Sequence, residues 1–184
     1  MGCTRSRGSR GFQCFVCSPR PGEPGRYPTQ IMNNKHQREG SKSNSHVGRE
    51  FEATARRILD SRGLILTPDH SVEVGVSNFT KSHEFDLGSE NPATIVECKS
   101  HKWTAGNNVP SAKMTTWNEA MYYFHCAPEK YRKIFFVLKD PRRSTGETLA
   151  EYYVRTYLHF IPDGVEIFEY DSVDDIVREL HDVG

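Results

Sequence analysis

Long hydrophobic runs are absent from this sequence, and their absence excludes a first class of protein. No apolar stretch approaches the roughly 20 residues that a membrane-spanning helix needs, and the N-terminus lacks the apolar core of a secretory signal. We therefore expect no membrane among the partners. Large apolar side chains are scarce in residues 1–46, where Arg, Ser, Gly and Pro predominate, and become periodic from Val47 onward. This contrast predicts a disordered basic leader over 1–46 and one globular domain over 47–184.

An excess of charge of either sign is also lacking, since the formal net charge is +0. The balance hides two unequal parts. Residues 1–46 hold eight Lys or Arg and two Glu, a charge of +6, which leaves −6 for residues 47–184. A domain that binds nucleic acid is normally basic, so this acidity counts against such a partner. The objection is limited, because a carboxylate cluster that binds divalent cations adds negative charge that the bound cations reverse.

Cysteines are few within the expected domain, which holds Cys98 and Cys126 far apart in the sequence. Two distant thiols give no disulfide framework, so a reducing, cytoplasmic location is expected. In the leader, Cys14 and Cys17 form a CxxC motif, but the three cysteines there fall short of the full ligand set of a structural zinc site. The sequence does not decide whether the leader binds zinc or whether the native chain starts at Met32.

The hydrophobic periodicity of residues 47–184 predicts a mixed α/β domain. Phe51, Ala55 and Leu59 recur at helical spacing in the first segment. The expected helices cover 48–63, 110–124, 147–158 and 172–180, and the second carries an apolar stripe at Met114, Trp117, Met121 and Phe124. The expected strands cover 64–66 and 72–76 (one broken strand or two), 84–87, 94–99, 133–138 and 165–168, of which 133–138 is apolar enough to be buried on both faces. The last helix depends on a capping-box-like pair, Ser172 and Asp175.

Two neighbouring strands gather acidic residues and a lysine. Because side chains alternate across a strand, Glu97 and Lys99 share one face of the second strand. On the first strand Asp86 lies on one face, and Phe85 and Leu87 share the opposite one. The turn between these strands, rich in Gly, Ser, Asn and Pro, predicts a hairpin.

The hairpin brings the acids together if it closes symmetrically over 88–93. Glu84 then lies opposite Glu97, and Asp86 becomes a diagonal neighbour of Glu97, within reach of one ion. Carboxylates this close repel each other unless a cation neutralises them. Oxygen ligands of this kind favour Mg²⁺, with Mn²⁺ as a substitute. Lys99, two residues from a ligand, would project toward whatever the metal binds and would hold a water nucleophile or offset charge on a phosphate. This chemistry is phosphodiester hydrolysis.

The first helix offers a third acid. Its residues step by about 100° around the axis, so Glu52 borders the apolar stripe while Glu50 points away from it. Glu52 is therefore the acid that is expected to reach the sheet.

These residues lie in two segments, GREFEATARRIL and EFDLGSENPATIVECKS, that together resemble the PD-(D/E)xK nuclease superfamily, the restriction-endonuclease-like fold. The positions that match the superfamily pattern are Glu52, Asp86, Glu97 and Lys99. The resemblance implies that the three acids hold Mg²⁺, that the backbone carbonyl of Cys98 is a further metal ligand, and that the lysine assists the attacking water.

The resemblance spans about Gly48 to Leu138 and implies an αβββαβ core, a central mixed sheet flanked by helices. It implies a Mg²⁺-dependent endonuclease that hydrolyses phosphodiester bonds, with DNA a better expected substrate than RNA, and a homodimer. The sequence departs from the pattern at Phe85, where the proline that names the motif would stand.

Several basic or aromatic residues near the lysine are candidates for holding the substrate. His101 and Lys102 follow the Lys99 strand and are expected to contact phosphate. Trp103 either stacks on a base or packs in the core. Lys113 is included because some members of the superfamily place a Lys or Gln early in this helix.

Two further groups have two interpretations each. Arg142 and Arg143 either bind a phosphate backbone or form a solvated turn. His83 either supports the site or is exposed at a strand edge, and the second interpretation is favoured.

Other functions fit the same sequence. The chain could be a catalytically silent module that binds nucleic acid or protein on the same fold, or a nuclease that acts on RNA. The simplest alternative is a solvated sheet face that carries a Glu–Lys pair. Restriction, repair and mobile-element roles are not separable from the sequence.

Overall fold

The computed structural model describes residues 44–181. The chain divides into a unit of residues 1–39 and a unit of residues 40–184, and every element described belongs to the second. The predictions for the leader and its cysteines, including zinc binding and a start at Met32, concern residues outside the described range.

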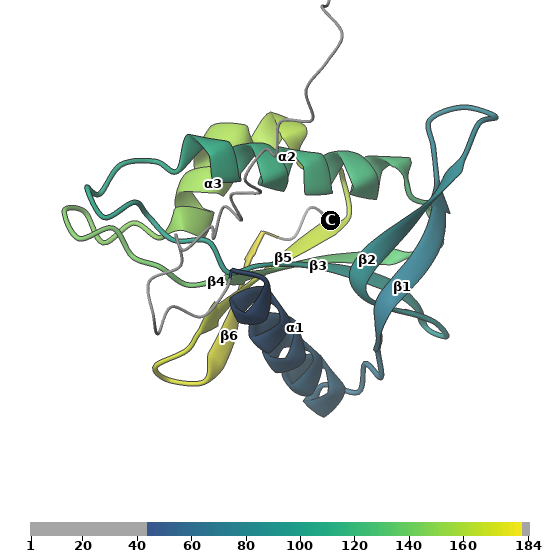
Figure 1. Ribbon diagram of the computed structural model, residues 1–184, viewed down its shortest axis with the longest axis horizontal. Helices are drawn as coiled ribbons and strands as arrows, with labels where there is room; N and C mark the ends of the chain where they lie inside the picture. The colour runs from purple at the N-terminus through teal and green to yellow at the C-terminus, as the bar shows by residue number, and fades with distance from the viewer. Residues whose placement is uncertain (1–43, 182–184) are drawn as a thin grey trace, which may run out of the picture. The chain divides into compact units, whose positions relative to one another are not determined.

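Three α-helices and a six-stranded sheet make up the described part (Figure 1). In chain order the elements are α1 (Asn44–Ser61), β1 (Thr67–Val74), β2 (Lys81–Glu90), β3 (Ala93–Lys99), α2 (Ser111–Cys126), β4 (Arg132–Leu138), α3 (Leu149–Tyr157), a 3-10 turn (Leu158–Phe160), β5 (Val165–Asp171) and β6 (Ile176–His181). The strands follow their numbers across the sheet; β3, β4 and β5 are parallel, and the other neighbours are antiparallel. The domain is mixed α/β, as predicted, and none of these helices is long and apolar enough to cross a membrane.

Helices cover both faces of the sheet (Figure 1). On one face α2 and α3 pack Trp117 and Tyr153 against Phe135 of β4. On the other face α1 packs Phe51 against Phe136, the next residue of β4. Because successive strand residues point to opposite faces, β4 contributes to both cores and is buried on both sides, which confirms the prediction. Each of these aromatic side chains stabilises the fold by about 1.5–3 kcal/mol through burial.

The first helix and the second lie where hydrophobic spacing predicted them. In α2 the expected apolar stripe is buried: Met114, Trp117, Met121 and Phe124. The end of α1 is set by Gly63, which has φ 85° and donates its N–H to the carbonyl of Asp60. Leu64 N–H donates to the carbonyl of Leu59 in the same turn. Both bonds belong to a glycine C-cap. The strand predicted at 64–66 is wrong, since β1 is one strand that begins at Thr67.

The final helix predicted over 172–180 is also wrong, because the chain forms a hairpin there. Asp171 Oδ1 accepts a hydrogen bond of 2.9 Å from the Val173 N–H, and Asp175 adopts φ 53°, so the chain turns back. β6 then pairs antiparallel with β5. Ser172 and Asp175 were misleading because Ser and Asp favour turns as well as helix caps.

A buried charge explains why β6 is a strand. The Glu169 side chain on β5 is 0% exposed, and Arg178 lies opposite it in the β5–β6 register. Arg178 Nε donates to Glu169 Oε2 at 2.6 Å, and its Nη2 donates to Glu151 Oε1 of α3 at 2.8 Å. A buried carboxylate needs such a partner, and only an extended chain at this edge supplies it.

We expect Arg178→Met to lower the free energy of unfolding by about 3 kcal/mol, because it leaves the Glu169 charge buried without a partner. The double variant Arg178→Met/Glu169→Leu should recover most of this loss, since both charges are then removed. Urea unfolding of the three proteins at neutral pH measures both effects. Equal losses in the single and the double variant would show that the ion pair does not hold β6.

Candidate active site

The candidate site lies where β2 and β3 separate. Their pairing runs from Glu90–Ala93 to Leu87–Val96 and stops there. At the next position Asp86 Oδ2 accepts a hydrogen bond of 2.7 Å from the backbone N–H of Cys98. The carboxylate satisfies a backbone donor that the ladder no longer pairs, and it is thereby held against β3.

Strand β2 twists sharply at the same point. Its side chains therefore do not keep the alternation between faces that a flat strand would give them. Phe85 packs in the core beneath α2, whereas Leu87 packs in the core beneath α1. The β1–β2 pairing skips Asp69 and Asp86, and Asp69 has φ 51°. The prediction that Phe85 and Leu87 share a face is therefore wrong. The predicted hairpin register is wrong as well, because an extension of the observed pairing sets Asp86 directly opposite Glu97, not diagonal to it.

Asp86, Glu97 and Lys99 lie together, and we call them the charged cluster. Lys99 Nζ lies 2.6 Å from Glu97 Oε2 and 3.9 Å from Asp86 Oδ2. The Glu97 side chain is 8% exposed and that of Asp86 is 26% exposed. Alternation along β3 holds as predicted: Glu97 and Lys99 face α2 across a cavity, while Cys98 packs with α1. A solvated sheet face does not describe these residues, because the cluster is largely buried.

The charged cluster has two carboxylates and one ammonium group, so its charge is unbalanced. Burial and the neighbouring Glu97 raise the pKa of Asp86 to about 6. Burial also acts to raise the pKa of Glu97, but His83 and Lys99 lower it by more, so the net pKa is below its ordinary value. Burial acts to lower the pKa of Lys99, and the two carboxylates raise it by more. Lys99 is therefore an ammonium ion at neutral pH, and a further cation would relieve the repulsion at Asp86.

His83 contributes to the site, although the sequence favoured an exposed strand edge. Its ring is 22% exposed and stacks on Tyr123, with 3.6 Å between the ring centroids. His83 Nε2 lies 3.6 Å from Glu97 Oε1, which is too long for a hydrogen bond, and it has no hydrogen-bond partner among the described residues. His83 thus acts on Glu97 through its field and its packing. The sequence carries no signal for this contact, because the coil of β2 creates it.

Glu52 approaches the charged cluster from α1. Its side chain is half-buried, whereas Glu50 is exposed and pairs with His46 at 3.4 Å. Burial is the main cause of the raised pKa of Glu52, and Lys99 and Glu97 are among the charges that act on it. The structure therefore places Glu52 within electrostatic reach of the cluster.

The donor set of the site fits a metal ion in its chemistry but not in its present arrangement. A cavity of about 380 Å³ adjoins the charged cluster, while Glu52 lines a different one. Within residues 44–181 no group of three or more His, Cys, Asp or Glu side chains is arranged to hold a metal ion. Lys99 instead forms ion pairs with both carboxylates of the cluster. The chemistry of the donors still fits Mg²⁺ or Mn²⁺, since the oxygens are hard ligands and carry an excess of negative charge.

His101 and Trp103 do not fit the direct contacts with a substrate that the sequence suggested for them. His101 Nδ1 accepts a hydrogen bond of 2.8 Å from Trp117 Nε1, and burial lowers the His101 pKa to about 4. His101 is therefore neutral near pH 7 and offers no positive charge to a phosphate. Trp103 is 9% exposed, so the packed interpretation holds and its ring is not open to a base.

Lys102 and Lys113 are both exposed and line one cavity of about 540 Å³ together with Lys99. Their side chains share this space although the two residues belong to different segments, the loop after β3 and the first turn of α2. The structure thus brings together the two lysines that the sequence singled out for the substrate.

Comparisons with known proteins give no indication of function. No protein-family model, curated protein or solved structure matches the chain. A functional proposal therefore depends on the charged cluster, on Glu52 and on the cavities around them.

We expect Asp86→Asn to stabilise the metal-free protein at neutral pH. The folded protein binds the Asp86 proton more tightly than the unfolded chain does, because the pKa is about 6 when folded and the ordinary pKa of the group is 3.8. This contribution to stability is present below about pH 4 and is lost as the pH rises through 6, so the advantage of Asn should grow over that range to about 1–3 kcal/mol. Asn also keeps an oxygen that accepts from Cys98.

Urea unfolding in EDTA between pH 4 and 8 measures this difference, with Ser82→Ala on the same strand as a control that does not titrate. If the stability difference between Asp86→Asn and the wild type stays constant with pH, burial does not raise the pKa of Asp86.

Proposed function

We propose that the chain is a metal-dependent endonuclease, with DNA as its substrate, on a restriction-endonuclease-like core. The observation that carries the proposal is the charged cluster: a buried carboxylate (Glu97), a partly buried carboxylate (Asp86) and an ammonium group beside an open cavity, with Asp86 held at a point where two strands separate. Charges that are buried at this cost beside a cavity mark a functional site more often than a structural one.

The order of elements supports the proposal of a restriction-endonuclease-like core. From α1 to β4 the chain runs helix, three strands, helix, strand, with helices on both faces of a mixed sheet. This is the αβββαβ order that the resemblance of residues 48–138 implies. The resemblance also implies a homodimer, which stays a prediction.

In the proposed site Asp86, Glu97, Glu52 and the Cys98 carbonyl would hold Mg²⁺. When bound, the ion would supply Lewis acidity toward a phosphate and would lower the pKa of a water molecule. Lys99 contributes its positive charge, because its raised pKa keeps it protonated. An ammonium group donates hydrogen bonds to a water or a phosphate oxygen but accepts no proton, so Lys99 positions the nucleophile and offsets developing charge.

A second function is favoured by one observation. The Lys99–Glu97 contact of 2.6 Å closes the cluster on itself, and no three-ligand group is preformed among the described residues. These features suit a catalytically silent module that binds nucleic acid or protein. An RNA substrate is a further alternative, and the experiments below separate all three.

We expect plasmid and branched DNA to be cut in Mg²⁺ and not in EDTA, and the rate to fall at least about a hundredfold in Asp86→Ala and in Lys99→Met, because each removes a group that contacts metal or the reacting phosphate. Lys130→Met makes the same side-chain change at a site where the lysine pairs with Glu90, and should cut normally. RNA of matched sequence tests the alternative substrate. Variants that cut as fast as the wild type would overturn the site.

Metal binding should distinguish two glutamates of one helix. We expect Glu52→Gln to weaken Mn²⁺ binding about tenfold, as loss of a metal ligand or of a group behind one does, while Glu50→Gln binds normally. Calorimetric titration of the two variants and the wild type measures this. A wild type that binds no Mn²⁺ or Mg²⁺ at millimolar concentration favours the silent module, and equal affinities of both variants would remove Glu52 from the site.

A further inference from the structure

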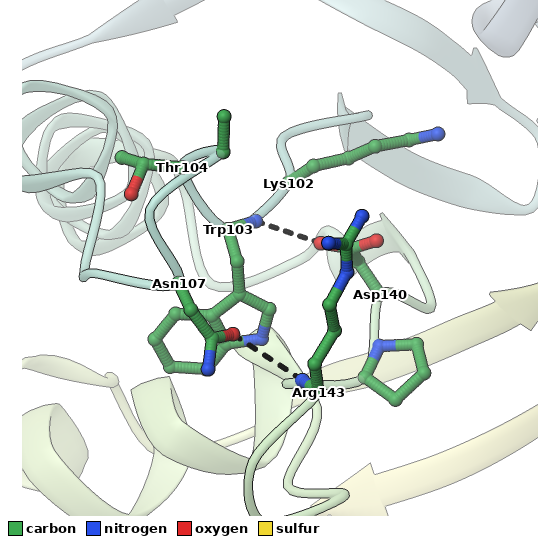
Figure 2. Close-up of a pocket in the computed structure, with 8 residues that line it drawn as sticks. Lys102, Trp103, Thr104, Asn107, Asp140 and Arg143 are labelled. Atoms are coloured by element: carbon green, nitrogen blue, oxygen red, sulfur yellow. Dashed lines mark hydrogen bonds between the residues drawn. The ribbon is translucent and has the colours of Figure 1, made fainter.

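A second cavity lies beyond the charged cluster, at the carboxyl ends of β3 and β4. It has a volume of about 300 Å³ and is lined by residues of two loops, among them Lys102, Trp103, Asn107, Asp140 and Arg143 (Figure 2). Ligands of open sheets with parallel strands bind outside the carboxyl ends of those strands, and β3 and β4 are parallel neighbours.

Hydrogen bonds between the two loops give this cavity a fixed shape. Trp103 N–H donates to Asp140 Oδ2 at 2.7 Å, and Arg143 N–H donates to Asn107 Oδ1 at 3.2 Å (Figure 2). Arg142 Nε donates to the Asn107 carbonyl at 3.1 Å, and its guanidinium lies 4.8 Å from the centroid of a Trp103 ring. These contacts hold both loops at backbone and side chain, so the cavity walls do not depend on a ligand.

The cavity is linked to the charged cluster through shared lining residues. Lys99 lines both the cavity at the cluster and the cavity of about 540 Å³ next to it. Lys102 lines that middle cavity and also the cavity of Figure 2. The middle cavity and the cavity of Figure 2 are therefore neighbours, and we call these two together the basic trough, which extends from Lys99, beside the charged cluster, past Lys113 to Arg143.

Beyond Lys99, the cations of the basic trough lack carboxylate partners. Lys102, Lys113 and Arg143 form no ion pair with any residue in the 44–181 range, and all three are exposed. Other exposed cations of the domain are ion-paired, among them Lys130, Arg132, Arg155 and Arg178. Exposed cations without an ion pair to a described residue also occur outside the trough, at Arg49, Arg62 and Lys81. What distinguishes the trough is that three unpaired cations line two neighbouring cavities.

Two residues that line the cavity, Asp140 and Trp103, bear on whether its ligand carries negative or positive charge. Asp140 is negative, but its Oδ2 accepts the Trp103 N–H, so this oxygen is already satisfied. Trp103 Nε1 is buried and has no hydrogen-bond partner in the described part of the chain. Because Lys102 and Arg143 both line the cavity, its cations outnumber its one carboxylate, which favours an anionic ligand.

We propose that the basic trough binds the sugar–phosphate backbone of a polynucleotide, with Lys102 and Arg143 holding a phosphate at a fixed number of nucleotides from the bond beside Lys99. This inference rests on the proposed function and deepens it, because it assigns the path of the substrate strand and a phosphate subsite. Phosphate contacts of this kind position a strand and carry no base specificity. The subsite therefore fixes where the strand is cut relative to its bound part.

The experiment measures binding without cleavage. Full-length protein in EDTA is titrated into fluorescein-labelled single-stranded and duplex DNA of about 20 nucleotides, by anisotropy at several NaCl concentrations. Arg143→Gln and Lys102→Gln are compared with Arg56→Gln on α1, which removes the same charge from a side chain 3.9 Å from Asp60. Arg143→Lys restores the charge. Any basic residues outside the trough contribute equally in every protein.

We expect Arg143→Gln and Lys102→Gln each to reduce the slope of log Kd against log[NaCl] by about 0.7 for single strands and about 0.9 for duplex. Arg56→Gln should leave the slope unchanged, and Arg143→Lys should restore it. Replacing one phosphate at a time with a neutral methylphosphonate should identify one position that weakens the wild type several-fold and has no effect on Arg143→Gln.

Two results would overturn the inference: slopes of Arg143→Gln and Lys102→Gln equal to that of Arg56→Gln, or a methylphosphonate scan with the same profile in wild type and Arg143→Gln. Displacement of DNA by inorganic phosphate beyond the effect of NaCl at equal ionic strength would assign the subsite to the free anion instead. The two proposals fail separately. DNA that binds through Arg143 but is never cut in Mg²⁺ contradicts the endonuclease alone, and DNA that is cut equally well by both trough variants, with unchanged slopes, contradicts the trough alone.

Discussion

The hydrogen bond from the Cys98 N–H to the Asp86 carboxylate is the constraint on which the site depends. A carboxylate can accept from β3 at this point only if the backbone of β2 no longer does so, and the pairing of the two strands accordingly stops at Leu87–Val96. The coil of β2 at the same place sends Phe85 into one core and Leu87 into the other. Groups from β2, β3 and α1 thus come within electrostatic reach of one another, which a flat hairpin would not allow.

Two clusters of the domain share a cation between two carboxylates, and they differ in the net pKa shift of one acid in each, Glu151 and Asp86. Around Arg178 the hydrogen bond from the Thr148 backbone, together with Arg178, lowers the pKa of Glu151, so that carboxylate is stabilised as an anion. In the charged cluster the pKa of Asp86 is raised, because burial and Glu97 outweigh Lys99. The first arrangement is what stability alone favours. The second keeps a repulsion that only a further positive group relieves, and this is why we assign function to the second cluster.

The parts of this structure that follow from short-range sequence patterns were predictable. The stripe of α2, the strand β4 and the shared face of Glu97 and Lys99 depend on local spacing within well-packed elements. Two features were not predictable, because each is decided by a distant partner. Phe85 and Leu87 lie in different cores near the point where β2 stops pairing with β3, and Arg178 of β6 lies opposite the buried Glu169 of β5. Hydrophobic spacing contains neither fact.

Net charge was the sequence observation that argued most against a polynucleotide, and the structure shows why it is a poor guide here. Several acids counted in the total of the domain are ion-paired, as Glu166 is with Arg132 and Glu147 with Arg155. At physiological ionic strength a charge is screened over about 8 Å, so a ligand in the trough is affected mainly by the groups that line it. There the unpaired cations Lys102 and Arg143 predominate. An acidic domain and a basic path for a phosphate backbone are therefore compatible, because the range of the field is shorter than the domain.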